Sequence, residues 1–220
     1  MTIRHILCFG DSLTWGWKPV PEGTPTTRYE RDERWTGVMA KALGDGFHVI
    51  EEGLSARTTT ALDANDPRLD GSAYLPAALA SHMPLDLVII MLGTNDAKNA
   101  YRRTAHDIAQ GMAKLVGQVA ASTGGVGTGY KAPALLVVAP PLPGDIPGPW
   151  LRAQFDGAVP KIAALATQYE ALAGARGAAF LDAAQHITTD GSDGVHFTPD
   201  NNRTLGEVLA GKVKDILQVE

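Results

Sequence analysis

The chain has 220 residues, which suits one α/β domain, and 45% of them are hydrophobic while 20% are charged. This composition excludes a disordered chain, and a formal net charge of −5 without a dense run of Lys or Arg excludes nucleic acid as an expected partner. No signal peptide is visible, and no apolar run approaches the roughly 18 residues of a membrane span. We therefore expect a cytoplasmic protein that does not contact membranes, with a single domain over residues 1–220.

Short apolar runs alternate with stretches of helical periodicity along the whole chain, a pattern typical of a parallel α/β sheet. Cys8, the only cysteine, falls in the first apolar run and is expected to be a small core residue. Strands are predicted over residues 3–9, 47–50, 85–92, 134–139 and 178–181. Helices are predicted over residues 35–43, 74–81, 104–121, 151–172 and 199–217. Two long excursions, residues 18–34 and 140–149, have no evident intrachain role and are expected to be functional or to contact a partner.

Three of the predicted strand ends lead into loops that carry polar residues: Ser12, Asn95, and the pair Asp193 and His196. Ligands bind at the carboxyl edge of an open parallel sheet, so Ser12 is a candidate nucleophile there. A spacing of three residues lets the Asp193 carboxylate accept from Nδ1 of His196, which leaves Nε2 free to take the serine proton. Asp190 is a rival partner for this ring. Structural alternatives are a helix-capping serine, an Asx-turn at Asp193 and a capping histidine.

Other sequence features give no comparable indication of chemistry. The remaining histidines have no paired acid in a loop, and no HExxH motif or Cys/His cluster indicates a metal. The glycine-rich segment 124–129 follows a helix and precedes a strand, the reverse of the order in a phosphate-binding loop. We therefore expect neither a metal nor an organic cofactor.

Four short blocks, in order along nearly the whole chain, resemble those of the GDSL/SGNH hydrolases. The blocks are Gly10-Asp11-Ser12-Leu13, Gly53-Leu54-Ser55-Ala56, Gly93-Thr94-Asn95-Asp96 and Asp193-Gly194-Val195-His196. Within that superfamily, the first two blocks and their flanks are most similar to bacterial arylesterases that also act as acyltransferases and perhydrolases. The resemblance implies a flavodoxin-like three-layer α/β/α fold with a five-stranded parallel sheet in the order 2-1-3-4-5.

The resemblance also implies roles for individual residues. Ser12 would be the nucleophile, His196 the base and Asp193 its orienting carboxylate. The oxyanion hole would consist of the N–H groups of Ser12 and Ala56 and the side-chain amide of Asn95. The broad family has glycine where this chain has Ala56, a departure that restricts the backbone because positive φ is costly for alanine. The arylesterase subgroup also has alanine there.

We therefore expect an esterase that cleaves small esters through an acyl-serine and passes the acyl group to water, alcohols or hydrogen peroxide. The candidate substrate channel comprises Leu13, Trp17, Lys98, Phe155 and Val195, and Trp15 is expected to pack in the core. The expected partners are small esters, alcohol acceptors and further copies of the chain in a homo-oligomer such as an octamer. The alternatives are a lysophospholipase or thioesterase of the same superfamily, a phosphate- or dinucleotide-binding module, and a catalytically dead interaction protein.

Overall fold

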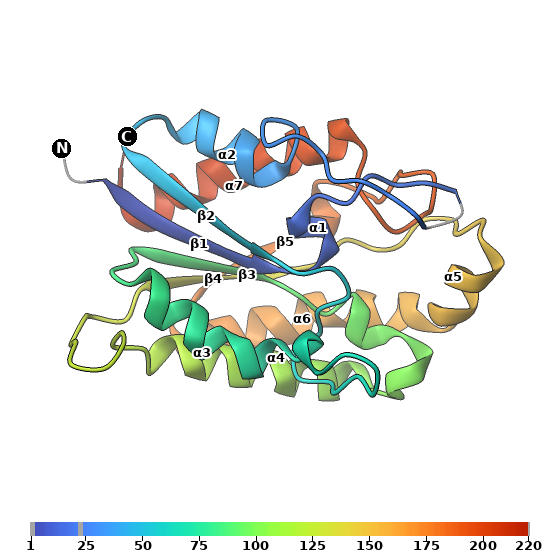
Figure 1. Cartoon of the computed structure of the whole chain (residues 1–220), viewed down its shortest axis with the longest axis horizontal. Coiled ribbons are helices and arrows are strands. Elements are labelled where there is room, and N and C mark those ends of the chain that lie inside the picture. The colour runs from blue at the N-terminus through green and yellow to red at the C-terminus, as the bar shows by residue number, and fades with distance from the viewer. Residues whose placement is uncertain (1–2, 22–23, 220) are drawn as a thin grey trace.

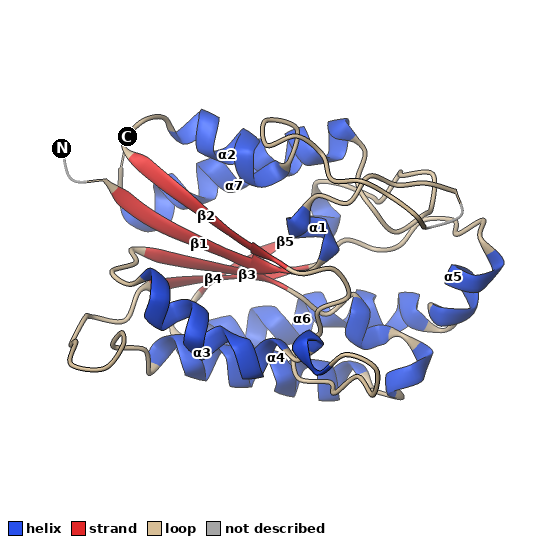
Figure 2. Ribbon diagram, viewed as in Figure 1, coloured by secondary structure: helices blue, strands red, loops and turns tan. Residues whose placement is uncertain are grey.

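Five parallel strands form the centre of the protein, whose structure is a computed structural model that describes residues 3–21 and 24–219. The strands are β1 (Arg4–Gly10), β2 (Phe47–Gly53), β3 (Leu87–Met91), β4 (Ala134–Ala139) and β5 (Ala179–Asp182). Their order across the sheet is β2-β1-β3-β4-β5, and every neighbouring pair is parallel (Figure 2). The predicted fold and strand order are therefore confirmed.

Helices cover both faces of this sheet (Figure 1). One layer consists of α2 (Trp35–Leu43) and α7 (Pro199–Leu217). The other layer consists of α3 (Gly71–His82), α4 (Ala105–Ala120) and α6 (Ala158–Arg176). Two short helices, α1 (Ser12–Trp15) and α5 (Pro149–Gln154), lie at the carboxyl edge of the sheet, together with the 3₁₀ turns η2 (Asn95–Ala97) and η3 (Asn99–Tyr101). The turns η1 (Pro67–Leu69) and η4 (Ala183–Gln185) complete the set among the described residues.

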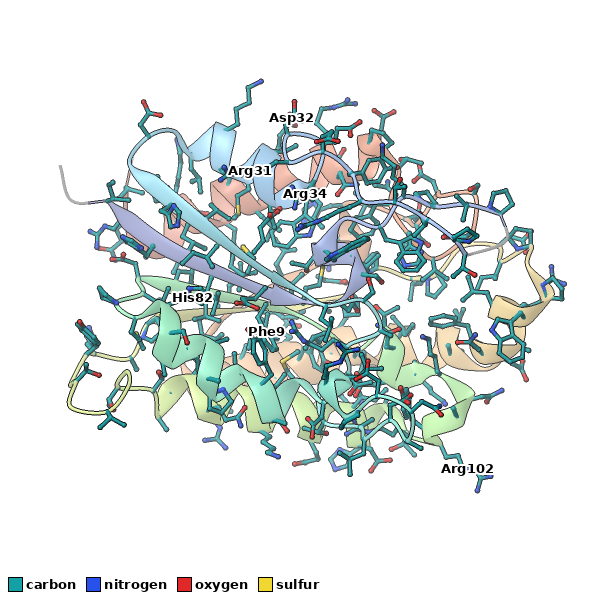
Figure 3. All side chains as sticks on the ribbon, viewed as in Figure 1. Phe9, Arg31, Asp32, Arg34, His82 and Arg102 are labelled. Atoms are coloured by element: carbon teal, nitrogen blue, oxygen red, sulfur yellow. The ribbon has the colours of Figure 1, made fainter. Side chains whose placement is uncertain are left out.

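The period of two along β1 divides its side chains between two hydrophobic cores. Ile6 and Cys8 are fully buried in the core beneath α2 and α7, as expected for Cys8. Leu7 and Phe9 are buried in the opposite core, where Phe9 points from the sheet toward α3 and α4 (Figure 3). Because both faces are covered, β3 has five fully buried apolar residues in succession, which explains its continuous hydrophobic sequence.

Several predicted boundaries were wrong for identifiable reasons. Strand β2 continues to Gly53, three residues beyond its apolar part, because these residues stay paired with β1, and Glu51 there binds Arg34, which is labelled in Figure 3. The helix predicted over residues 151–172 is two helices, α5 and α6, interrupted at Gly157, whose φ of +69° cannot continue a right-handed helix. Helix α3 begins at Gly71 because Asp70 caps it.

Both long excursions have intrachain roles, contrary to the expectation from the sequence. In the first, of which residues 22 and 23 lie outside the described part, Lys18 N–H donates to the Thr27 carbonyl at 3.0 Å. The Tyr29 hydroxyl then donates to the Phe197 carbonyl at 3.2 Å. In the second excursion, Gly144 N–H donates to the Gly194 carbonyl at 2.7 Å. The two excursions therefore support the loop that carries His196.

Across residues 3–21 and 24–219, none of the helices combines the length and the apolar composition that crossing a membrane requires.

Candidate active site

Ser12 is the first residue of α1, separated from the end of strand β1 by Asp11 alone. Asp11 is the N-cap of this one-turn helix, and its carboxylate accepts from the Leu13 N–H at 2.9 Å. A side chain at Gly10 would collide with Thr14, so glycine allows the chain to turn sharply from strand to helix. This local geometry places the Ser12 hydroxyl at the carboxyl edge of the sheet.

The Ser12, His196 and Asp193 side chains form one hydrogen-bonded chain. Ser12 Oγ lies 2.9 Å from His196 Nε2, and His196 Nδ1 lies 2.7 Å from Asp193 Oδ2. The Asp193 carboxylate has no exposed surface, and the Ser12 and His196 side chains are also buried. Since the carboxylate can only accept at Nδ1, the ring keeps Nε2 free to accept the serine proton.

The loop that holds Asp193 and His196 is shaped by two glycines. Gly194 has a φ of +75°, and a side chain at Gly191 would collide with the His196 carbonyl. The second carboxylate oxygen of Asp193 accepts from the N–H groups of Val195 and His196, both at 2.9 Å. Burial raises the pKa of Asp193, but the hydrogen bonds from His196 and these N–H groups outweigh it and hold the pKa below its ordinary value.

Asp190, the rival partner for the histidine ring, has another structural role. Its carboxylate accepts from the Thr198 hydroxyl at 2.8 and 3.0 Å, beside the N-cap of α7. The structure therefore brings Asp193, and not Asp190, to the His196 ring.

The three predicted oxyanion donors converge beside Ser12. The N–H of Ser12 belongs to the first turn of α1 and has no place in the helix hydrogen-bond ladder. Ala56 has a φ of +68°, an uncommon value for alanine, and no group in the described part of the chain accepts from its N–H. The Asn95 amide comes from η2, after strand β3, and lines the same cavity as Ser12 and Ala56.

The chain matches the GDSL-like Lipase/Acylhydrolase family over residues 8–203, a span that includes all of these side chains. The chain belongs to this family. No significant match was found among curated protein sequences.

Solved structures of GDSL acylhydrolases and related enzymes are similar to this chain along nearly its whole length. The native aryl esterase of M. smegmatis is 58% identical with a TM-score of 0.95, and the match covers 97% of this chain and 99% of that one. Est24, a carbohydrate acetylesterase from Sinorhizobium meliloti, is 57% identical with a TM-score of 0.95, covering 96% and 99%. A carbohydrate acetylesterase family member from the same organism is 36% identical with a TM-score of 0.91, covering 99% and 100%.

The acylhydrolase cavity above Ser12 has a volume of about 200 Å³. Its wall includes four of the five residues predicted to line a substrate channel, namely Trp17, Lys98, Phe155 and Val195. The Trp17 indole stacks on the His196 ring, with 4.9 Å between ring centroids and 16° between planes. The Lys98 ammonium lies 5.3 Å from the centroid of the Phe155 ring. Burial lowers the pKa of Lys98, although Asp11 and Asp63 oppose this effect.

Two other predicted placements differ from the structure. Leu13 does not line the cavity, because its side chain points from α1 into the core that contains Trp35 and Met39. Trp15 is only half-buried, and its ring lies between Arg28, at 5.4 Å from the centroid, and Trp17. The fully buried tryptophan is Trp35, the first residue of α2.

Sequence reasoning missed the outer wall of the cavity and the polar groups beneath its floor. Trp150, Leu151 and Gln154 of α5 line the cavity, as do Thr24 and Ser55. The spacing of Trp150, Leu151 and Gln154 in the sequence gave no indication of the direction in which α5 faces. Asp11 and Arg57 are nearly fully buried beside Asn95, and only the rarity of buried charge could have identified them in advance.

The carboxyl group of Asp11 has a raised pKa. Burial raises its pKa to about 7, and nearby Asp96 acts in the same direction. The Leu13 N–H and the positive charges of Lys98 and Arg57 oppose this increase. Across residues 3–21 and 24–219, no cluster of three or more His, Cys, Asp or Glu side chains is arranged to hold a metal ion.

Proposed function

We propose that this acylhydrolase cleaves small esters of short acyl chains, with aryl or alkyl leaving groups, and transfers the acyl group to water, alcohols or hydrogen peroxide. The observation that carries the proposal is the hydrogen-bonded chain of Ser12, His196 and Asp193 at the base of a small cavity. The similarity to an aryl esterase and to a carbohydrate acetylesterase supports the same class of substrate.

The proposed first half-reaction forms the acyl-serine. Ser12 Oγ attacks the ester carbonyl carbon as His196 Nε2 takes the hydroxyl proton, and the Asp193 carboxylate stabilises the resulting imidazolium. The tetrahedral oxyanion accepts hydrogen bonds from the donors at Ser12, Ala56 and Asn95. The bond to the leaving oxygen then breaks, and His196 returns the proton to the departing alcohol.

The second half-reaction determines the product. Water, an alcohol or hydrogen peroxide loses a proton to His196 and attacks the acyl carbon, which gives an acid, a new ester or a peracid, and Ser12 recovers its proton. The cavity wall includes the apolar side chains of Trp17, Leu151, Phe155 and Val195. An apolar, narrow entrance favours an organic acceptor over disordered water, and this supports the transferase part of the proposal.

The volume of the cavity favours short acyl chains over the lysophospholipase alternative. About 200 Å³ is below the roughly 300–1,000 Å³ of pockets that enclose drug-sized ligands, and a long acyl chain would need a groove. Comparison of p-nitrophenyl acetate with p-nitrophenyl palmitate tests this choice. Faster turnover of the palmitate ester would favour the lipid substrate.

The central experiment measures ester cleavage and acceptor choice together. We expect the enzyme in water to convert vinyl acetate and benzyl alcohol into benzyl acetate as well as acetate. Ser12→Ala should reduce turnover by about 10⁶-fold, as in other enzymes that lose a nucleophilic serine. Retention of more than a tenth of the activity would exclude Ser12 as the nucleophile, and acetate without any benzyl acetate would restrict the function to hydrolysis.

We further infer that the enzyme is a homo-oligomer. Trp150 on α5, which lines the cavity, is 79% exposed, and Val159 at the start of α6 is 45% exposed. Exposed apolar surface of this kind is typical of interaction sites. Light scattering should give a multiple of the 23.2 kDa chain mass at micromolar concentration, and a monomer would contradict this inference.

A further inference from the structure

The Asn95 amide is held between two acceptors that belong to the segments of the other two oxyanion donors. Asn95 Nδ2 donates to Asp11 Oδ2 and to the Arg57 carbonyl, both at 3.2 Å. Asp11 directly precedes Ser12, and Arg57 directly follows Ala56. One buried amide group therefore connects all three donors.

Above pH 7, where the Asp11 carboxyl is ionised, both partners of this amide are pure acceptors, which determines its orientation. An ionised carboxylate and a carbonyl can bind only the nitrogen end of an asparagine side chain. If the amide turned over, its oxygen would face the Asp11 and Arg57 oxygens in a site from which water is excluded, since Asp11 is 1% exposed. The partners thus keep the nitrogen, and not the oxygen, between the segments that carry Ser12 and Ala56.

Arg57 is itself fixed by the surrounding structure. Its guanidinium donates to the Gly10 carbonyl at 2.9 Å and to the Glu52 carbonyl, and it lies 4.2 Å from the centroid of the Phe9 ring. The Arg57 carbonyl is consequently a rigid acceptor. Asp11 is the partner whose side chain can be changed without moving the backbone, and its two oxygens perform separate tasks, because Oδ1 caps α1 and Oδ2 holds Asn95.

We propose that Asp11 is a positioning residue for the oxyanion hole, which acts by orienting the Asn95 amide toward the developing oxyanion. Bonds of 3.2 Å are at the long end of the hydrogen-bond range, so the Asn95 nitrogen can share a hydrogen with an incoming oxyanion without losing its orientation. This inference rests on the proposed function, since it assigns a task within the same acyl-transfer site.

Asp11→Asn removes one of the two acceptor oxygens that cap α1 and orient the Asn95 amide. An amide has one acceptor oxygen where the carboxylate has two, so Asn at position 11 cannot both cap α1 and accept from Asn95. Asp11→Ser is a second variant that keeps a capping oxygen but places no acceptor at Asn95. Asp70→Asn is the matched control, because Asp70 is also a buried N-cap, of α3, and within the described residues its carboxylate binds only Ser72.

The experiment is a double-mutant cycle between positions 11 and 95, with kcat and KM measured on p-nitrophenyl acetate. Asn95→Ala should lower kcat by about 10²–10³-fold, as expected for loss of one oxyanion donor. Asp11→Asn and Asp11→Ser should each lower kcat at least tenfold with KM changed less than twofold, and Asp70→Asn should leave kcat unchanged. In the Asn95→Ala background, the Asp11 substitutions should have no further effect.

Two results would overturn the proposal. One is a kcat within twofold of wild type for both Asp11 variants. The other is a full multiplication of the Asp11 and Asn95 effects in the double variants, because a merely structural role would act regardless of residue 95. If the wild-type protein released no p-nitrophenol at all, the proposed function itself would fail, an outcome that is distinct from the other two.

Discussion

Asp11→Asn should also change how the stability of the protein depends on pH. The Asp11 carboxyl has an ordinary pKa of 3.8 in the unfolded chain and a pKa of about 7 in the folded protein. Between these values the folded protein binds a proton that the unfolded chain has already lost. The free energy of unfolding that Asp11 contributes is therefore largest at low pH and falls as pH rises toward 7.

The size of this effect follows from the two pKa values. At about 1.4 kcal/mol for each pKa unit, the whole window corresponds to about 4 kcal/mol, and about 3 kcal/mol of it lies between pH 5 and pH 8. Asn does not titrate, so Asp11→Asn removes the pH-dependent part. It also loses one hydrogen bond of the carboxylate, a constant cost of about 1 kcal/mol at every pH.

Urea denaturation of both proteins at pH 5, 6, 7 and 8 measures the difference. All other titrating groups are common to the two proteins, so their contributions cancel. We expect the unfolding free energy of the variant to rise relative to wild type by about 3 kcal/mol from pH 5 to pH 8, with unchanged m-values. Asp11→Ser should show the same trend. If the difference in unfolding free energy between variant and wild type changed by less than about 0.5 kcal/mol from pH 5 to pH 8, a raised pKa at Asp11 would be refuted.

Three further predictions concern the active site directly. Asp193→Asn should lower kcat by about 10⁴-fold, because the tautomer of the His196 ring is no longer fixed. Asp190→Asn should lower the melting temperature, because Asp190 supports the cap of α7, and should leave kcat nearly intact. The reverse order of effects on kcat would show that the wrong carboxylate has been assigned. Trp17→Val should admit bulkier esters and lower the transfer-to-hydrolysis ratio measured with benzyl alcohol. An unchanged ester preference and product ratio would contradict a role of Trp17 in selecting substrates. Ala56→Gly should raise the unfolding free energy by up to about 1 kcal/mol, since glycine adopts a φ of +68° without strain, and a clear destabilisation in a urea titration would contradict this reason.

The parts of the fold and site that could be predicted from the sequence depend on local patterns. Strand β4 and helix α2 were predicted with their observed bounds, because a continuous apolar run and a terminal glycine determine them locally. The pairing of Asp193 with His196 follows likewise from a spacing of three residues in a glycine-containing loop. In each case the interacting groups are close in sequence.

The parts that could not be predicted depend on contacts between distant segments. Trp15 and Trp35 are both apolar, and only the packing of α2 on the sheet determines that Trp35 is the buried one. The contact of Asp11 with Asn95 spans 84 positions, so no periodicity in the sequence reports it. The roles of the two excursions were missed for the same reason, since Tyr29 reaches a carbonyl 168 residues away.

The short helix α5 has a consequence for how this enzyme can change. It projects from the carboxyl edge of the sheet (Figure 1), begins after Gly148, ends before Gly157, and buries none of its six residues. Trp150, Leu151 and Gln154 nevertheless form one wall of the cavity. Substitutions at Trp150 and Gln154 should therefore leave the two hydrophobic cores intact while they alter the shape of the entrance, whereas Leu151 also packs against the core beneath α4 and α6. The Ser12–His196–Asp193 arrangement and the surface at Trp150 and Gln154 can thus change independently, and a combinatorial library at these two positions is a direct way to alter ester preference.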